Sequence, residues 1–506
     1  MNGFRAAFCR RVPGEVEHIM EYEVVVGLEV HAQLLTKSKM FCGCSSEYQD
    51  GEPNSVVCPV CMGMPGVLPV INKKAVEHTI RTGLALGCTI ARNTKFDRKN
   101  YPYPDLMKGY QISQFDMPVA SDGCLEIQVD GQTRPIGVTR VHLEEDAAKL
   151  LHRTEDYGEG YSLLDINRAG VPLMEIVGEP DLRSADEARE YLVQLHTILQ
   201  FIGTSVANME EGNFRCDANV SIRPKGDEEL GTKVEVKNMN SFRSVHRAIE
   251  FEVKRQIALL ESGGRIEQET RGWVDDEEIT VSQRTKEYAS DYRYFPEPDL
   301  PPITLDPLWV KEIRESLPEL PAARRARFVN DLGLSEYDAE LLTISRATAD
   351  YFETALNSDT SPSNEMAKAI GNWMLGEMAR LQNQTGTLLD DVNIAPSQIV
   401  ELQKLVDGGT LSSSMAKAVF EKMYNTGANP QAITEADGLA QISDSDAVGA
   451  AIDDAISANP QPVRDYLEGK ESAIQFLVGQ VMRITRGKAN PQMTTELLKN
   501  KLEAMK

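Results

Sequence analysis

The first regular pattern in the chain lies in residues 22–33, YEVVVGLEVHAQ, where apolar and polar residues alternate. Side chains on a β-strand point to opposite faces in turn, so this pattern predicts a strand with one apolar face. That apolar face consists of Val24, Val26, Leu28 and Val30. Glu29 and His31 share the other face, where a carboxylate and an imidazole suit either a bound cation or acid–base catalysis. The solvated face of an amphipathic strand would show the same pattern.

Four later stretches also have the pattern of strands: residues 138–149, 163–177, 208–223 and 233–237. In the first of them, Glu144 shares a face with His142 and Asp146. In the second, we expect Asp165 and Asn167 to share a face of a short strand. Glu175 follows within the apolar run LMEIV. Because an unpaired buried charge is costly, we expect Glu175 to be paired or functional.

Residues 208–223 show the clearest alternation. The apolar face consists of Phe214, Cys216, Ala218, Val220 and Ile222, and the polar face consists of Arg215, Asp217, Asn219, Ser221 and Arg223. Five polar positions with both signs of charge indicate either the floor of a site or a solvated sheet face. The KVEVK stretch repeats the pattern and places Lys237 on its polar side.

Helical patterns and helix-capping residues separate these strands. Residues 72–86, 184–202 and 240–261 are predicted to be helices, the first ended by Gly87. Ser184 and Glu187 have the spacing of a capping box, and Asn240 or Ser241 is expected to cap the third helix. From about residue 296 the chain is helical in pattern, with glycine, serine and proline breaks across residues 385–415.

This order of elements predicts three folded parts. We expect an α+β domain over residues 20–297, an all-α helical domain over 298–410 and an all-α tail domain over 411–506. Residues 1–19 contain three arginines and no acid before Glu15, and they are expected to be a poorly ordered extension with Met20 as an alternative start.

Charge and hydropathy narrow the class of protein. The 506-residue chain has a formal net charge of −24, which argues against binding to nucleic acid through a general basic surface. An RNA contact would need a local basic cluster, and Arg483, Arg486 and Lys488 form the best candidate, although a solvated helix end fits these residues equally well. No apolar run approaches the roughly 20 residues of a membrane span, so we expect a cytoplasmic protein without a membrane segment.

Four of the eight cysteines have the spacing of metal ligands. They are Cys42, Cys44, Cys58 and Cys61, arranged as two close pairs joined by a short loop. Four thiolates in this arrangement suit tetrahedral zinc in a structural site. We therefore expect a zinc-binding insert over residues 41–64, with four ordinary buried thiols as the alternative.

Two further stretches are rich in aromatic and charged residues. Residues 99–114, KNYPYPDLMKGYQISQ, contain prolines that forbid a regular helix and include Lys99 and Tyr101. This stretch is either a substrate or nucleotide loop or a rigid surface loop. Residues 270–302 combine arginines, lysine and tyrosines, which fit either contacts to phosphate or surface ion pairs.

The assembled motifs resemble the B-subunit family of the aspartyl/glutamyl-tRNA(Asn/Gln) amidotransferases. The resemblance runs from about Glu21 to the C-terminus, and its pieces occur in one order. They are VGLEVHAQL, FCGC, CPVCMGMPGVLPV, KNYPYPDLMKGYQISQ, HLEEDAAK, DINRAGVPLMEIV, MEEGNFRCDANVS, VEVKNMNSFR, DYRYFPEPDLPP and GQVMRITRGKANP.

This resemblance implies a glutamine-synthetase-like cradle for the first domain and a tRNA-binding role for the tail domain. It implies a heterotrimer with an amidase A subunit, which releases ammonia from glutamine, and a small C subunit. The B subunit would use ATP and Mg²⁺ to phosphorylate the side-chain carboxyl of Glu on misacylated tRNA(Gln), or of Asp on misacylated tRNA(Asn). Ammonia would then displace the phosphate, giving Gln-tRNA(Gln) or Asn-tRNA(Asn).

The candidate site residues follow from this chemistry. Magnesium favours oxygen ligands, and a mixed oxygen and nitrogen set also suits manganese. We expect the metal ligands to be Glu29, His31, Glu144 and Glu175. Asp217 is added as a catalytic residue, with Glu210 as a less certain member. Arg215 and Lys237 are expected to contact phosphate.

Two other functions would use the same features differently. A zinc-stabilised RNA-binding scaffold without chemistry of its own would explain the cysteines and the basic cluster, but it leaves Glu29, His31, Glu144 and Glu175 without a role. A free-standing metal-dependent hydrolase or ligase would turn over a small molecule without partners.

Overall fold

The computed structural model describes residues 21–154, 160–285, 292–439, 445–485, 489 and 491–505. The chain divides into two compact units, and the division falls between Leu320 and Pro321. The predicted extension at residues 1–19 lies outside the described residues. Among the described residues, no helix is both long enough and apolar enough to cross a membrane.

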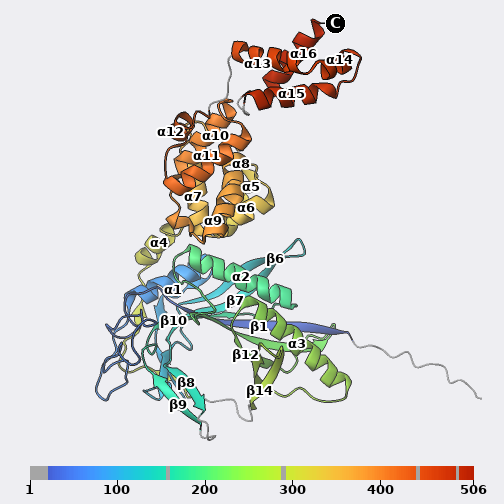
Figure 1. Cartoon of the computed structure of the whole chain (residues 1–506). Helices are drawn as coiled ribbons and strands as arrows, with labels where there is room; N and C mark the ends of the chain where they lie inside the picture. Colours follow the sequence, from blue (N-terminus) through green and yellow to red (C-terminus); the bar gives the residue numbers. More distant parts are fainter. Residues whose placement is uncertain are drawn as a thin grey trace, which may run out of the picture. The chain divides into compact units, whose positions relative to one another are not determined.

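A nine-stranded sheet organises the first unit (Figure 1). The strand order is β14-β13-β12-β11-β1-β10-β7-β6-β2, with β1 in the middle. Neighbours are antiparallel except for the parallel pair β12 and β13, so the sheet is mixed. The strands are β1 (Tyr22–Gln33), β2 (Thr89–Ile90), β6 (Ala120–Val129), β7 (Gln132–Glu145), β10 (Pro172–Gly178), β11 (Phe214–Pro224), β12 (Val234–Met239), β13 (Glu269–Val274) and β14 (Ile279–Thr285).

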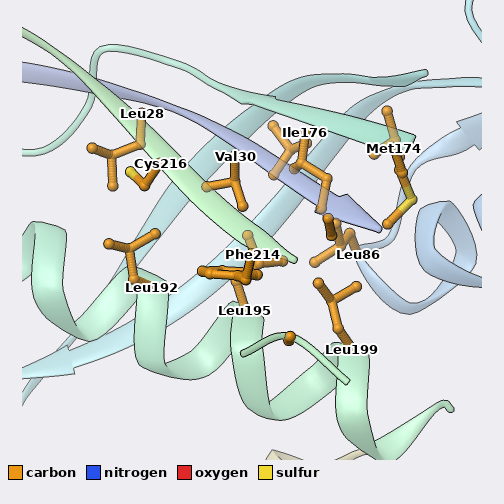
Figure 2. Packing of buried hydrophobic residues seen from close by; sticks show 14 of the residues in the cluster. Leu28, Val30, Leu86, Met174, Ile176, Leu192, Leu195, Leu199, Phe214 and Cys216 are labelled. Atoms are coloured by element: carbon orange, nitrogen blue, oxygen red, sulfur yellow. The ribbon is translucent and has the colours of Figure 1, made fainter. Parts of the chain in front are cut away.

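The apolar face of this sheet is covered by helices. They are α1 (Lys73–Ala85), α2 (Ala185–Phe201) and α3 (Phe242–Glu261). Figure 2 shows Val30 of β1 and Phe214 of β11 packed toward Leu192 and Leu195 of α2, and all four side chains are fully buried. The alternation predicted for β1 and β11 is confirmed, because their apolar side chains enter this core. Their polar side chains therefore lie on the opposite face of the sheet.

The predicted helix starts are confirmed, with one change of detail. The side chains of Asn72, Ser184 and Ser241 accept hydrogen bonds from the first turns of α1, α2 and α3. The capping box expected at Ser184 is incomplete. Glu187 donates its backbone N–H to Ser184, but its carboxylate accepts the N–H of Arg183 at 2.7 Å instead of the N–H of Ser184.

Three small sheets join loops on the first unit. They are formed by β4 (Asp97–Asn100) with β5 (Tyr110–Ser113) and β15 (Phe295–Pro296), by β3 (Asn93–Thr94) with β16 (Ile303–Thr304), and by β8 (Lys149–Thr154) with β9 (Gly160–Asp165). The prediction that Asn167 lies on a strand face with Asp165 is wrong. Strand β9 ends at Asp165, and Asn167 lies in the turn that follows. Its side chain hydrogen-bonds to the backbone of the cysteine-containing loop.

The second unit is helical, as predicted. Its helices are α5 (Pro321–Asn330), α6 (Glu336–Leu342), α7 (Arg346–Asn357), α8 (Asn364–Asn372), η1 (Trp373–Met378), α9 (Ala379–Thr385), η2 (Leu389–Asp391), α10 (Pro396–Asp407), α11 (Ser413–Thr426), α12 (Pro430–Ala436), α13 (Ser445–Ala458), α14 (Pro460–Leu467), α15 (Ala473–Ile484) and α16 (Pro491–Glu503). One further helix, α4 (Pro307–Glu315), belongs to the first unit.

Packing within the helical unit continues across the predicted division between residues 410 and 411. Helices α11 and α12 both pack against α10. A separate core begins only with α13, where Val448, Ile452, Leu477 and Leu498 are fully buried among α13, α15 and α16. Helices α10 to α12 thus belong to one set of packed helices, and a second set begins with α13.

Candidate active site

Cross-strand pairing places three ionisable residues in one row on the polar face of the large sheet. In the β-sheet register, His31 of β1 lies opposite Glu175 of β10, and Glu175 lies opposite His142 of β7. Residues that pair directly project to the same face. The Nε2 atoms of His31 and His142 lie 3.4 Å and 3.3 Å from Oε2 of Glu175. The carboxylate of Glu175 therefore lies between two imidazoles.

Glu144 completes a cluster with His31 and Glu175. Its Oε1 atom lies 3.6 Å from Nε2 of His31, and each of the three residues has a ligand atom within 4.8 Å of the others. Glu144 and Glu175 are only 2% and 7% exposed. Two buried carboxylates and one imidazole, converging from three strands, suit a divalent cation that keeps open positions for a substrate.

The electrostatics of the cluster favour bound positive charge. Burial opposes protonation of His31, but the hydrogen bond and charge of Glu175 and the charge of Glu144 together raise the pKa of His31 to about 9. Burial would raise the pKa of Glu175, yet the charges and hydrogen bonds of His142 and His31 hold it well below its usual value. The ionised carboxylate of Glu175 therefore attracts a cation to the centre of the cluster.

Hydrogen bonds from neighbouring strands orient the ligands. Ser113, at the end of β5, donates its hydroxyl to Oε2 of Glu144 at 3.4 Å. His142 contacts Glu175 from the side away from His31. Supporting groups of this kind fix the orientation of metal ligands. Ser113 and His142 were not among the predicted site residues, although His142 precedes Glu144 by two positions on the same strand face.

Glu29 lies on the same sheet face but outside this cluster. Its Oε1 atom accepts a hydrogen bond from Asn219 Nδ2 at 2.9 Å, and its register partner on β11 is Asp217. Lys237 lies 2.8 Å from Asp217 and 3.3 Å from Glu235. The sheet therefore carries a second polar group beside the cluster, in which the predicted residues Glu29, Asp217 and Lys237 are neighbours.

Arg215 lies on the same sheet face as the cluster, but its guanidinium group is already paired with the carboxylate of Asp146. Its two terminal nitrogens each lie 3.0 Å from an oxygen of Asp146. Burial opposes the charge of Asp146, yet the charges of Arg215 and Arg168 keep the pKa of this carboxyl below its usual range. The predicted contact of Arg215 with phosphate remains a prediction. Glu210 is exposed and lies along a separate hollow with His196 and Asn240, away from the cluster.

Lys99 is a further cation beside the carboxylate cluster. Burial disfavours its charge, but the charges of Glu144 and Glu175 are among the causes that raise its pKa. The ammonium lies 4.9 Å from the ring centroid of Tyr292. Lys99 belongs to the aromatic stretch noted in the sequence, but no feature of that stretch indicated that Glu144 and Glu175 would influence its charge.

The four predicted zinc ligands come together in loops that follow β1. One sulfur atom from each of Cys42, Cys44, Cys58 and Cys61 lies within 4.8 Å of the others. A hydrogen bond from Cys42 lowers the pKa of Cys61 to about 4 against the effect of burial, and the ammonium of Lys39 adds to this effect. Lys39 is fully buried and donates to the carbonyl of Val56 at 2.8 Å. The donor set fits a tetrahedral thiophilic ion.

Hydrogen bonds from the Asn167 side chain and the Gly170 carbonyl fasten the cysteine loops to the segment before β10. Asn167 is fully buried, accepts the N–H of Val56 at 2.8 Å and donates to the carbonyl of Glu52 at 2.8 Å. Met40 donates its N–H to the carbonyl of Gly170 at 2.6 Å. Residues 167–170 lead directly into β10, the strand that carries Glu175. The same short segment therefore holds the cysteine loops and precedes the Glu175 strand.

The predicted RNA contact is described only in part. Arg483 is exposed at the C-terminal end of α15. Arg486 and Lys488 lie outside the described residues. The basic cluster at this end of the helical unit therefore remains a prediction.

Comparison with known proteins identifies the family. The GatB/GatE catalytic domain model matches residues 24–311, and the GatB domain model matches residues 350–502. The B subunit of the aspartyl/glutamyl-tRNA(Asn/Gln) amidotransferase from Dehalococcoides mccartyi strain CBDB1 is 56% identical over 96% of this chain and 99% of its own length. The proteins of the same name from Carboxydothermus hydrogenoformans and Thermoanaerobacter sp. strain X514 are each 54% identical, over 95% and 96% of this chain and 99% and 100% of their own lengths. The chain belongs to the family of aspartyl/glutamyl-tRNA(Asn/Gln) amidotransferase B subunits.

Proposed function

We propose that this chain is the ATP-dependent transamidation subunit of a tRNA-dependent amidotransferase. It phosphorylates the side-chain carboxyl of Glu on misacylated tRNA(Gln), or of Asp on misacylated tRNA(Asn), and amidates it with ammonia. The observation that carries this proposal is the cluster of His31 with the buried carboxylates Glu144 and Glu175, found in a chain of this family.

The chemistry requires activation because a carboxylate is a poor acyl donor. In the first step, a carboxylate oxygen of the substrate side chain bonds to the γ-phosphorus of ATP, and ADP leaves. In the second step, the nitrogen of ammonia bonds to the acyl carbon, inorganic phosphate leaves with the carboxyl oxygen, and the leaving phosphate takes one proton from the nitrogen. A bound Mg²⁺ or Mn²⁺ would supply neutralisation of the phosphate charge.

The residues of this chain perform distinct tasks in that scheme. His31, Glu144 and Glu175 would hold the divalent ion, while His142 and Ser113 orient the two carboxylates. Lys237 and Arg215 would contact phosphate, and Glu29 and Asp217 stand beside them on the same sheet face. Burial of the cluster excludes water, which would otherwise hydrolyse the acyl phosphate.

The wider assembly follows from the same proposal. The first unit would be a glutamine-synthetase-like cradle, with an amidase A subunit and a small C subunit completing a cytoplasmic heterotrimer. The four cysteines would hold one structural zinc ion. The C-terminal helices, with Arg483, Arg486 and Lys488, would bind the tRNA.

The test replaces a ligand without changing its shape. In the complete complex, Glu144→Gln is expected to lower transamidation of Glu-tRNA(Gln) by on the order of 100- to 1,000-fold, while glutamine hydrolysis by the amidase partner continues. Glu250→Gln, on the solvent side of α3, is the matched control. Normal transamidation by the Glu144→Gln complex would refute the assignment of the reacting centre.

A further inference from the structure

Two aromatic-rich segments from distant parts of the chain meet beside the carboxylate cluster. The first runs through β4 and β5, and the second leads into β15, which pairs with β4. Asn100 fastens them together, because its backbone N–H donates to the carbonyl of Tyr292 and its Nδ2 donates to the carbonyl of Arg293, each at 2.9 Å. Neither segment contributes a ligand to the metal cluster.

Four rings from these segments contact one another in a row, which we name the aromatic platform. Its members are Tyr101, Tyr292, Tyr294 and Phe115. Ring centroids are separated by 5.6 Å between Tyr101 and Tyr292 and by 6.0 Å between Tyr292 and Tyr294, in edge-to-face geometry. Phe115 stacks on Tyr294 with centroids 4.3 Å apart and an angle of 10° between the ring planes.

The outer end of the platform is open to solvent. The side chain of Phe115 is 56% exposed, and Tyr294 is partly exposed. A pair of stacked rings that contributed mainly to the core would be covered. This pair instead presents flat apolar surface at the protein boundary, which a planar ligand could cover.

The platform adjoins the groups that would carry out the reaction. Ser113, which donates to Glu144 at 3.4 Å, precedes Phe115 by two residues. The ammonium of Lys99 lies 4.9 Å from the ring centroid of Tyr292 and 5.9 Å from that of Tyr101. A ligand stacked on the rings would therefore have a cation and the carboxylate cluster next to it.

The backbone around the platform is rigidly held. Arg98 of β4 donates to both oxygens of Glu297, at 2.6 Å and 2.8 Å, just beyond β15. The N–H of Phe115 donates to Asp97 at 3.1 Å. Arg293, between Tyr292 and Tyr294, has a positive φ of 44°, which is strained for a non-glycine residue. Such strain persists where the surrounding structure enforces it, and it is frequent at binding sites.

We infer that the aromatic platform binds an adenine base by stacking, with Phe115 and Tyr294 as its outer surface. The inference rests on the proposed function, because both ATP and the 3′ end of a tRNA carry an adenosine. Stacking on aromatic side chains is how proteins commonly hold unpaired bases. The ligand class is an adenosine whose phosphate or ester end points to the carboxylate cluster.

The test measures the KM values for ATP and for Glu-tRNA(Gln) separately, in the complete amidotransferase complex. Phe115→Leu and Tyr294→Leu remove a ring but keep apolar bulk. Each is expected to raise one of the two KM values about 5- to 150-fold, since stacking contributes about 1–3 kcal/mol per base, and to leave kcat within about twofold. Tyr294→Phe keeps the ring and should behave like the native complex. Tyr337→Leu changes an exposed tyrosine of the helical unit and serves as the control.

The pattern of KM values distinguishes the sources of the adenosine. A rise for ATP alone assigns the platform to the nucleotide, and a rise for the tRNA alone assigns it to the 3′ end. If both leucine variants leave both KM values unchanged, the platform inference is overturned. A native complex that does not transamidate at all would instead overturn the proposed function.

A second measurement uses the native complex first, so its main result does not depend on the folding of a variant. One probe is tRNA with 2-aminopurine as its 3′-terminal base, and the other is 2-aminopurine riboside triphosphate. Stacking on the platform is expected to quench the fluorescence of one probe on binding, and the quench should persist with Tyr294→Phe. Binding of both probes without a change in fluorescence would contradict the inference.

Discussion

Within the part of the chain that the structure describes, two clusters can hold a metal ion, and they are built in opposite ways. His31, Glu144 and Glu175 project from three adjacent strands in the middle of a nine-stranded sheet. Cys42, Cys44, Cys58 and Cys61 all lie outside regular helices and strands. The first set is positioned by backbone pairing on both sides of each strand, whereas the second is positioned by loops that are themselves held at a few points.

We therefore expect the carboxylate cluster to keep its geometry without a metal ion. The geometry of the cysteine cluster is expected to depend on metal binding. The strands around Glu175 are fixed by a buried core on the other face of the sheet, so a change of ligand there should alter chemistry more than folding. The cysteine loops have little core of their own, and a metal ion bound to four thiolates would contribute directly to their stability. The following substitutions act on the carboxylate cluster, on the cysteine loops or on the link between them.

The largest effect is expected from Glu175→Gln. Loss of the buried charge between His31 and His142 should lower transamidation by on the order of 1,000-fold. The apolar face of the sheet is untouched, so the melting temperature should stay within a few degrees. Steady-state rates and calorimetry of the same preparation measure both. A large loss of melting temperature would mean that this cluster, too, is chiefly structural.

The next largest effect is expected from a change to His142, which contacts the carboxylate of Glu175. His142→Gln removes the second imidazole on Glu175 but keeps a polar side chain of similar length. Affinity for Mn²⁺ or Mg²⁺, obtained by titrating activity with the ion, is expected to fall about 10- to 100-fold, with the rate at saturating metal largely kept. His246→Gln, which changes the partly exposed partner of Asp186, is the control. Unchanged metal affinity would show that His142 does not orient the site.

A third experiment acts on the cysteine loops. Cys58→Ser is expected to reduce the bound zinc from about one ion per chain and to cost about 2 kcal/mol of local stability. Cleavage of residues 41–64 by a protease would then be roughly 30-fold faster. Cys124→Ser alters an exposed cysteine outside the cluster and should change neither quantity. A stable native protein without zinc would defeat the structural-metal proposal.

The smallest effect is expected at the link between the two regions. Asn167→Ala removes two hydrogen bonds to the cysteine loops, at Val56 and Glu52. Leaving these backbone groups unpaired should cost about 1–3 kcal/mol, seen as faster hydrogen exchange in residues 52–56. The affinity of the carboxylate cluster for metal should change less than twofold. A strong loss of metal affinity would instead show that the loops help to position Glu175.

The difference between the regions also governs what could be predicted from sequence. All four cysteines that come together were predicted to do so, because ligand spacing in short loops is a local property. The carboxylate site was predicted less completely. Glu144, Glu175 and His31 do meet, but Glu29 lies with Asn219 and Asp217, and Arg215 is bound to Asp146. The position of His142 beside Glu175 and the effect of Glu144 and Glu175 on the charge of Lys99 were not anticipated.

The sequence by itself determined where helices such as α1, α2 and α3 begin and which face of strands such as β1 and β11 is apolar, because capping and alternation act over a few residues. It also carried the family resemblance that the comparisons confirmed. Only the tertiary structure decided which polar residues of the shared face touch one another. That outcome depends on the register between strands far apart in the chain, such as β1 with β10 and β10 with β7. Register is set when the whole apolar face packs, and a shift of two residues would keep every face assignment while changing every pair of neighbours.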